Sequence, residues 1–274
     1  MIASLIITFR ETLEAALIVG IILGFLSKTK QTRYNNVVYI GVVAGITASI
    51  IGALIFMSVL GGFEGRAEQI FEGITMLIGA ILLTTMIIWV SKQKELYAGL
   101  KDKVNKNIQE ANRIGLFLLI FISILREGVE TIIFLGAASF NSDGNTLIGA
   151  LVGIVLAIIL GYVLFVSSKK INVKKFFNIT SIILILFAAG LIAGAVHEFS
   201  EAKILPPIVE EVWNINPQAP LASQGIYPVL HEKGHVGGLL KGLFGYNGNP
   251  SLLEFLAYVL YAIIFLFFWL KKPK

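Results

Sequence analysis

Long apolar runs alternate with polar connections along the whole chain. Seven runs approach the roughly 20 residues that a helix needs to cross the hydrocarbon layer of a membrane. They lie at about 2–26, 37–60, 70–91, 114–138, 145–166, 176–196 and 252–270. The strict alternation of apolar and polar positions typical of a membrane β-barrel is missing. The pattern therefore predicts an all-α polytopic membrane protein with seven transmembrane helices in a single transmembrane domain, residues 1–274.

Two polar connections are long enough to carry structure of their own. Residues 92–112 mix both signs of charge and predict an amphipathic helix at the cytoplasmic surface. Residues 197–251 hold most of the prolines, and we expect an ordered outer loop with short helices there.

Composition agrees with a membrane protein and excludes several other classes. Of the 274 residues, 56% are hydrophobic and 14% are charged, whereas a soluble domain is about 25% charged. An ordinary soluble globule and a disordered chain are therefore excluded. With no cysteine, the chain has no disulfide, no thiolate metal site and no cysteine nucleophile.

The basic residues predict the orientation in the membrane. The connections after the first, third and fifth runs, together with the C-terminus, hold 16 of the 22 Lys and Arg residues. Cytoplasmic connections carry such an excess, so we expect the N-terminus outside and the C-terminus in the cytoplasm, in the plasma membrane. The net charge of +5 is thus a signal of topology and gives no argument for binding nucleic acid.

One charged motif occurs twice. The sequence R-E-T-L-E at residues 10–14 recurs as R-E-G-V-E at residues 126–130, and in each half the next apolar run opens with G-x-x-x-G, at residues 41–45 and 149–153. The first three runs therefore look related to the next three. Because three is an odd number, the second copy must be inverted relative to the first, as in many secondary transporters.

In this scheme repeat A covers about 1–91 and repeat B about 113–196. The linker lies at about 92–112, and the outer loop at about 197–251 precedes the seventh run.

The two motifs place charges where a membrane should exclude them. The charged set is Arg10, Glu11, Glu14, Arg126, Glu127 and Glu130. A charge at the bilayer centre costs at least about 2.5 kcal/mol. Within each motif the Arg and the second Glu are four residues apart, so they share a helix face and can pair. Both motifs fall at similar depth, and together they carry four negative and two positive charges. A bound cation would reduce this excess.

A carboxylate site without sulfur ligands suits hard ions: Mg²⁺, Ca²⁺, Mn²⁺ or ferric iron. The residues alone leave this choice open. They also leave open a proton relay without a metal, or two Arg–Glu pairs that only stabilise helix packing.

The doubled motif in a seven-run chain resembles the oxidase-dependent iron permease family, which includes the fungal high-affinity iron permease and the bacterial Efe-type iron-uptake permease. Three further stretches are similar to that family: E-Q-I-F-E-G at residues 68–73, H-E-F-S-E-A at 197–202, and the segment at 242–251, the last two resembling the bacterial branch.

The resemblance implies high-affinity import of iron, with ferric iron delivered after oxidation of ferrous iron at the outer face. Glu11, Glu14, Glu127 and Glu130 would be the iron ligands, and Arg10 and Arg126 would orient them and balance their charge. The resemblance also implies a separate partner, because the chain shows no copper or haem ligands of its own. In the bacterial branch this partner is a haem peroxidase and a periplasmic or surface-anchored iron-binding protein.

Two groups at the outer face are candidates for an outer capture site. Glu64, Glu68 and Glu72 follow one helical face, and His197, Glu198 and Glu201 form a second group. The alternative for both groups is a solvated acidic surface. His231 and His235 also share a helical spacing, but the glycines around them argue against a helical metal site.

Other functions remain open on the sequence. A proton-coupled permease for another divalent cation such as manganese would use the same carboxylates. A membrane-embedded carboxylate metalloenzyme is disfavoured, because the Glu-x-x-His motif of di-iron bundles does not occur in the first or fourth run. We therefore expect a transporter that binds iron as its substrate, with no permanently bound cofactor. A purely structural membrane scaffold would bind no metal.

Overall fold

The computed structural model describes residues 2–90, 93–140, 146–166, 173–206, 208–215, 227–231 and 234–270. Its helices are α1 (Ile2–Lys28), α2 (Asn35–Leu60), α3 (Arg66–Val90), α4 (Gln93–Gln109), α5 (Arg113–Phe140), α6 (Thr146–Val166), α7 (Val173–Glu201), α9 (His235–Phe244) and α10 (Leu252–Leu270), with a short 3-10 turn at Thr32–Tyr34. Among the described residues no strand occurs, which confirms the all-α class.

Each predicted apolar run coincides with one long helix. Four segments are long and apolar enough to cross a membrane: Thr32–Val59, Arg66–Ile88, Thr146–Val163 and Thr180–Glu201. Helices α1 and α5 are as long, but each carries the three charges of its motif. The apolar part of α10, Leu252–Phe267, is shorter. The structure thus supports a membrane-spanning protein, and the count of seven crossings stays a prediction.

The surface of the outermost helices is apolar rather than polar. On α2, Ile50 and Leu54 are 57% and 61% exposed, and on α6 Val155 and Ile159 are each 55% exposed. A water-soluble protein rarely leaves such large contiguous apolar surfaces open. These faces suit contact with lipid.

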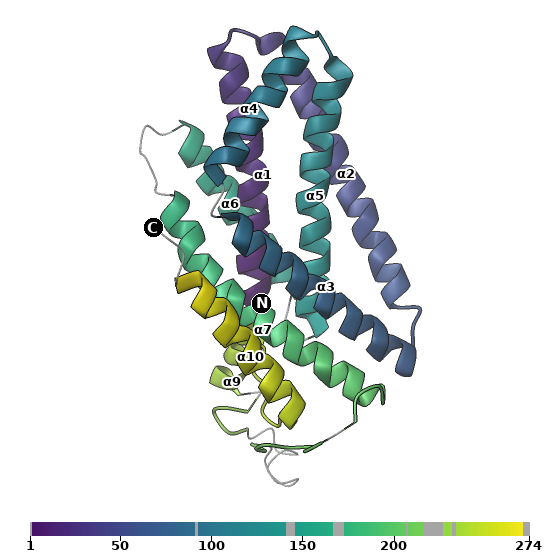
Figure 1. The fold of residues 1–274 in the computed structure, drawn as a ribbon. Helices are drawn as coiled ribbons and strands as arrows, with labels where there is room; N and C mark the ends of the chain where they lie inside the picture. The colour runs from purple at the N-terminus through teal and green to yellow at the C-terminus, as the bar shows by residue number, and fades with distance from the viewer. Residues whose placement is uncertain are drawn as a thin grey trace.

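The helices of the two proposed repeats pack across the boundary between them. Helix α1 packs mainly against α6, and α5 packs mainly against α2. Helix α3 packs against α7, and α10 packs against α7 as well. In Figure 1 these three helices run diagonally across the molecule. The motif helix of each half therefore lies against the second helix of the other half.

Glycines at these two crossings occupy corresponding positions. Gly45 of α2 lies against Ile124 and the Phe121 carbonyl, two and five residues before the motif arginine of α5. Gly153 of α6 lies against Thr8 and the Leu5 carbonyl, two and five residues before the motif arginine of α1. A side chain at either glycine would overlap the neighbouring helix. The glycine contacts of the first helix pair thus correspond to those of the second.

Helix α4 covers the end of the bundle where α1 and α2 meet (Figure 1). Val104 and Ile108 are buried and join an apolar cluster with Ile22 and Leu26 of α1, whereas its exposed residues include Lys103. The predicted amphipathic helix is therefore present at 93–109.

Among its described residues, the connection from α7 to α10 includes the short helix α9. It ends at Gly245, whose φ of +65° is a left-handed conformation that favours glycine. Gly245 packs backbone to backbone on Gly190 in the middle of α7. This glycine pair anchors the loop to the helix bundle.

Candidate metal centre

The first motif lies on α1, where its arginine holds both glutamates. Arg10 Nη1 donates a hydrogen bond to Glu11 Oε1 at 3.1 Å, and Nη2 pairs with Glu14 Oε1 at 3.0 Å. The Arg10 side chain is fully buried, and it also contacts the sulfur of Met86 on α3. The guanidinium therefore fixes the two carboxylates in place, as its planar fork favours.

The second motif lies on α5, and it is arranged differently. Arg126 Nε donates to Glu130 Oε1 at 2.7 Å, one turn further along the helix. The Arg126 side chain is 47% exposed, while Glu127 and Glu130 are buried. The i, i+4 pair expected from the spacing is present in both motifs.

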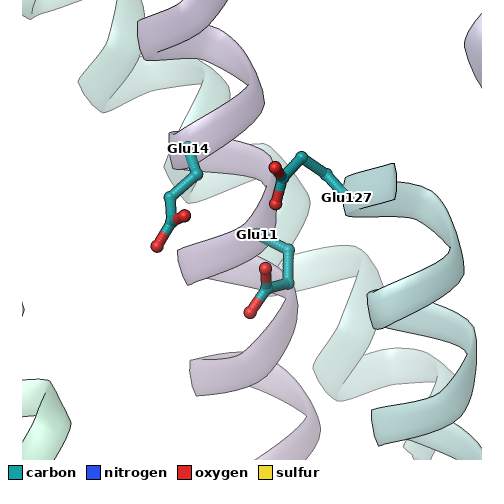
Figure 2. Close-up of side chains that lie close together, drawn as sticks. All are labelled: Glu11, Glu14 and Glu127. Atoms are coloured by element: carbon teal, nitrogen blue, oxygen red, sulfur yellow. The ribbon is translucent and has the colours of Figure 1, made fainter. Parts of the chain in front are cut away.

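Three of the four glutamates meet between α1 and α5. Figure 2 shows Glu11 and Glu14 on one helix and Glu127 reaching toward them from the other. One oxygen from each of these carboxylates lies within 4.8 Å of one from each of the others. Glu130 is not part of this group.

Three oxygens in the group have no hydrogen-bond donor among the described residues: Glu11 Oε2, Glu14 Oε1 and Glu127 Oε2. Glu14 Oε1 is compensated by its ion pair with Arg10, whereas Glu11 and Glu127 are both more than nine-tenths buried. A buried carboxylate oxygen without a donor is costly, and a cation between the helices would satisfy it. Oxygen ligands in this arrangement suit a hard or borderline metal ion.

Met86 is a neighbour of this centre that the sequence did not indicate. It lies on α3 with no charged motif or spacing to single it out, and it contacts Arg10 of α1. A sulfur atom therefore lies beside the arginine of the first motif.

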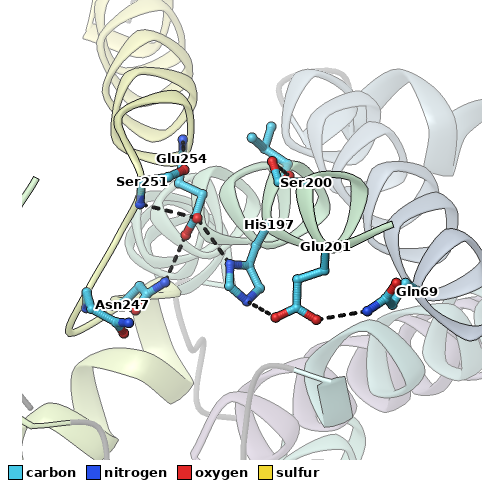
Figure 3. A network of polar contacts seen from close by, with 9 residues as sticks. Gln69, His197, Ser200, Glu201, Asn247, Ser251 and Glu254 are labelled. Carbon is cyan, nitrogen blue, oxygen red and sulfur yellow. Dashed lines mark hydrogen bonds and ion pairs between the residues drawn. The ribbon is translucent and has the colours of Figure 1, made fainter. Parts of the chain in front are cut away.

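The outer group centred on His197 forms a connected network, shown in Figure 3. Nδ1 of His197 lies 3.1 Å from Glu254 Oε1, and its Nε2 lies 3.3 Å from Glu201 Oε1. Gln69 of α3 donates to Glu201 Oε2 at 2.9 Å. The ends of α3, α7 and α10 are thereby tied together.

Glu254 is the part of this network that the sequence analysis missed. It is 4% exposed, accepts hydrogen bonds from Asn247 Nδ2 and the Ser251 amide, and in return the Glu254 amide donates to Ser251 Oγ. This is a capping box at the first turn of α10. In the sequence, the S-x-x-E spacing at the start of the last apolar run could have indicated this capping box.

The other outer candidates lie around this network without joining its hydrogen bonds. Glu198 is close enough to Glu72 and Glu68 for their negative charges to interact. Glu64 and Glu68 are exposed, and Glu72 is partly buried. His231 is buried and stacks on Tyr227, and the His235 side chain lies outside the described residues. Within the described ranges, these outer residues do not form a cluster of three ligands.

The comparisons with known proteins identify the family of this chain. The Iron permease FTR1 family matches residues 1–272, and those residues include both motifs. The chain belongs to the iron permease FTR1 family. It is thus a permease of the bacterial branch by similarity, and its membrane character and iron transport follow from that membership.

Curated relatives match the chain from end to end. The "Ferrous iron permease EfeU" of Escherichia coli O6:H1 is 32% identical over 280 residues, which cover all of this chain and 97% of the relative. The protein of the same name from Shigella sonnei is also 32% identical, with the same coverage. That of Yersinia pestis is 31% identical over 278 residues and is covered to 95%. No solved structure matches.

Proposed function

We propose that this permease imports iron across the cytoplasmic membrane through the centre between α1 and α5. The observation that carries this proposal is the convergence of Glu11, Glu14 and Glu127 within 4.8 Å, with buried oxygens that lack a donor. Three carboxylates held this close repel one another unless a cation or protons reduce their charge. Iron is the cation that the family membership favours.

The proposed path crosses a bundle of seven membrane helices with the N-terminus outside. Support comes from the seven long helices and from the basic residues at alternate connections. The inverted repeat is supported by the exchanged pairs α1–α6 and α5–α2 and by their matching glycine contacts. In this arrangement the centre lies at the interface of the repeats, where secondary transporters bind their substrates.

The proposal extends to how iron arrives. The relatives are named for ferrous iron, and the oxygen-rich centre favours the harder ferric ion. We propose that ferrous iron is the external supply and that a separate extracytoplasmic oxidase or iron-binding protein delivers ferric iron. His197, Glu198, Glu201 and the glutamates at 64, 68 and 72 would capture it at the outer face. Iron is the cargo, and the chain itself is a transporter rather than an enzyme.

The decisive test is iron uptake by glutamine variants of the central glutamates. Glu14→Gln and Glu127→Gln keep the side-chain size and remove one negative charge, and each should reduce radioactive iron uptake at least tenfold. The matched control is Glu110→Gln, because Glu110 is exposed at the end of α4 and its variant should transport normally. Cells without other iron importers are the host.

Uptake that stays undiminished in both central variants would contradict the assignment of these ligands. Competition by unlabelled Mn²⁺ in the same assay separates iron from the alternative divalent cation. Uptake measured with a strict ferrous-iron supply, with and without an external oxidant, tests the oxidation step.

A further inference from the structure

The two motif arginines share a sequence context but differ in their surroundings. Arg10 is fully buried and bridges Glu11 and Glu14. Arg126 is about half exposed and bonds to Glu130 through Nε. The two arginines therefore have different surroundings, although the spacing of the two motifs is the same.

The four glutamates of the two motifs are therefore not equivalent in position. Glu11, Glu14 and Glu127 form the close group, and Glu130 stays outside it. Glu130 is nevertheless near enough for its charge to interact with those of Glu11 and Glu127. The bond of Glu130 to Arg126 competes with any ion held there.

We propose that Arg10 is the fixed counter-charge of the iron centre and that Arg126 is its displaceable one. Arg126 withholds Glu130 from the ion, and Glu130 becomes a fourth ligand when this pair opens. This inference rests on the proposed function and assigns different positioning roles to two arginines that the sequence makes equivalent.

The energetic argument follows from burial. A guanidinium with no exposed surface cannot leave its partners without stranding buried charges, which costs several kcal/mol. Arg126 has nearly half of its side chain exposed, so when its pair with Glu130 opens the guanidinium is not enclosed by protein. Arg10 therefore keeps the ligands in place, whereas Arg126 can be replaced by the ion as the partner of Glu130. An exchangeable ligand lets a transporter bind its cargo and then release it.

The test compares the same substitution at both arginines in the purified full-length protein. Iron affinity is measured by titration with a soluble Fe³⁺ chelate, and in parallel with Fe²⁺ under anaerobic conditions, in lipid nanodiscs; maximal uptake rate is measured in reconstituted vesicles. Arg126→Gln frees Glu130 for the ion, so it should bind iron about tenfold more tightly and transport it more slowly. Arg10→Gln should bind iron at least tenfold more weakly.

Charge-conserving variants separate these roles from folding. Arg126→Lys restores a displaceable cation and should return affinity and rate toward the wild type. Arg10→Lys should stay impaired, because an ammonium cannot bridge two carboxylates as the guanidinium fork does. Glu130→Gln should slow uptake without tightening binding.

Weaker binding by Arg126→Gln, or equal effects of Arg10→Gln and Arg126→Gln, would overturn the proposal. If Arg10→Gln does not fold, Arg126→Gln and Glu130→Gln against the wild type decide the question. A wild-type protein that binds no iron at all contradicts the proposed function, whereas bound iron with equivalent arginines contradicts only this inference.

Discussion

Gly153 lets α6 reach the backbone of α1 directly beside the first motif. A side chain here would overlap the Thr8 hydroxyl and the Leu5 carbonyl. The same crossing carries the hydrogen bond from Thr8 Oγ1 to the Ala150 carbonyl at 2.9 Å. Close approach of backbones is a main source of stability between membrane helices. The depth and rotation of the α1 carboxylates therefore depend on a residue that has no side chain.

Replacing Gly153 by alanine should destabilise the protein by about 1–3 kcal/mol, because the added methyl group overpacks the crossing. Gly24 is the matched control on α1, since a side chain there meets nothing within 4 Å. Gly24→Ala should be neutral or slightly stabilising. Thermal unfolding of both variants in detergent, followed by tryptophan fluorescence, measures the difference. Equal melting temperatures for the two variants would contradict a tight α1–α6 crossing.

The sequence predicted the pairing within each motif and the meeting of the two motifs, because helical spacing and depth are local properties. It did not predict the exclusion of Glu130 from the close group, the exposure of Arg126, or the contact of Met86 with Arg10. Each of these depends on how α3 and α5 are rotated against α1. Rotation is set by packing among helices, and a single sequence does not encode it as a pattern.

At the scale of elements, the beginning of α10 is joined to α7 through one side chain. Glu254 completes the capping box with Ser251. Its side-chain carboxylate also contacts Nδ1 of His197 on α7. Because a cap residue satisfies backbone groups that have no partner within the helix, it fixes where the helix begins. The position of α10 on α7 is thus set by the same carboxylate that orients His197.

Ser251→Ala should cost about 1 kcal/mol, the usual effect of losing one cap. Glu254→Ala should cost more, because it also removes the partner of His197 and Asn247. A double-mutant cycle between His197 and Glu254, measured by thermal unfolding, isolates the link between the helices. A coupling energy near zero would show that the network does not hold α10 to α7.

Long elements were the most predictable part of the fold, since each apolar run became a helix with ends within a few residues of the expected ones. The membrane limits a spanning chain to few structures, so hydropathy alone locates the helices. The contact of Gly245 with Gly190 was not predictable, because it joins a loop to the middle of α7. Such contacts between distant segments leave no periodic signal.

For the whole molecule, the proposed orientation places α4 and the end of α7 on opposite sides of the membrane. The chain has no cysteine, so single cysteines can be introduced into the native background. Lys103→Cys on α4 should react with an impermeant maleimide only after the cells are opened, and Lys203→Cys beyond α7 should react in intact cells. Both lysines are exposed. Labelling of both from the same side would contradict the predicted topology.

The exchanged packing of α1 with α6 and of α5 with α2 has a consequence for how the protein is made. Helix α1 ends at Lys28, and its main partner begins only at Thr146. The ribosome therefore completes the helix that carries the three charges of the first motif long before the surface that will enclose them exists. Helices with charges at membrane depth are expensive to leave facing lipid. The first half therefore stays incompletely packed until the second half has been made. The two halves then reach their final structure together.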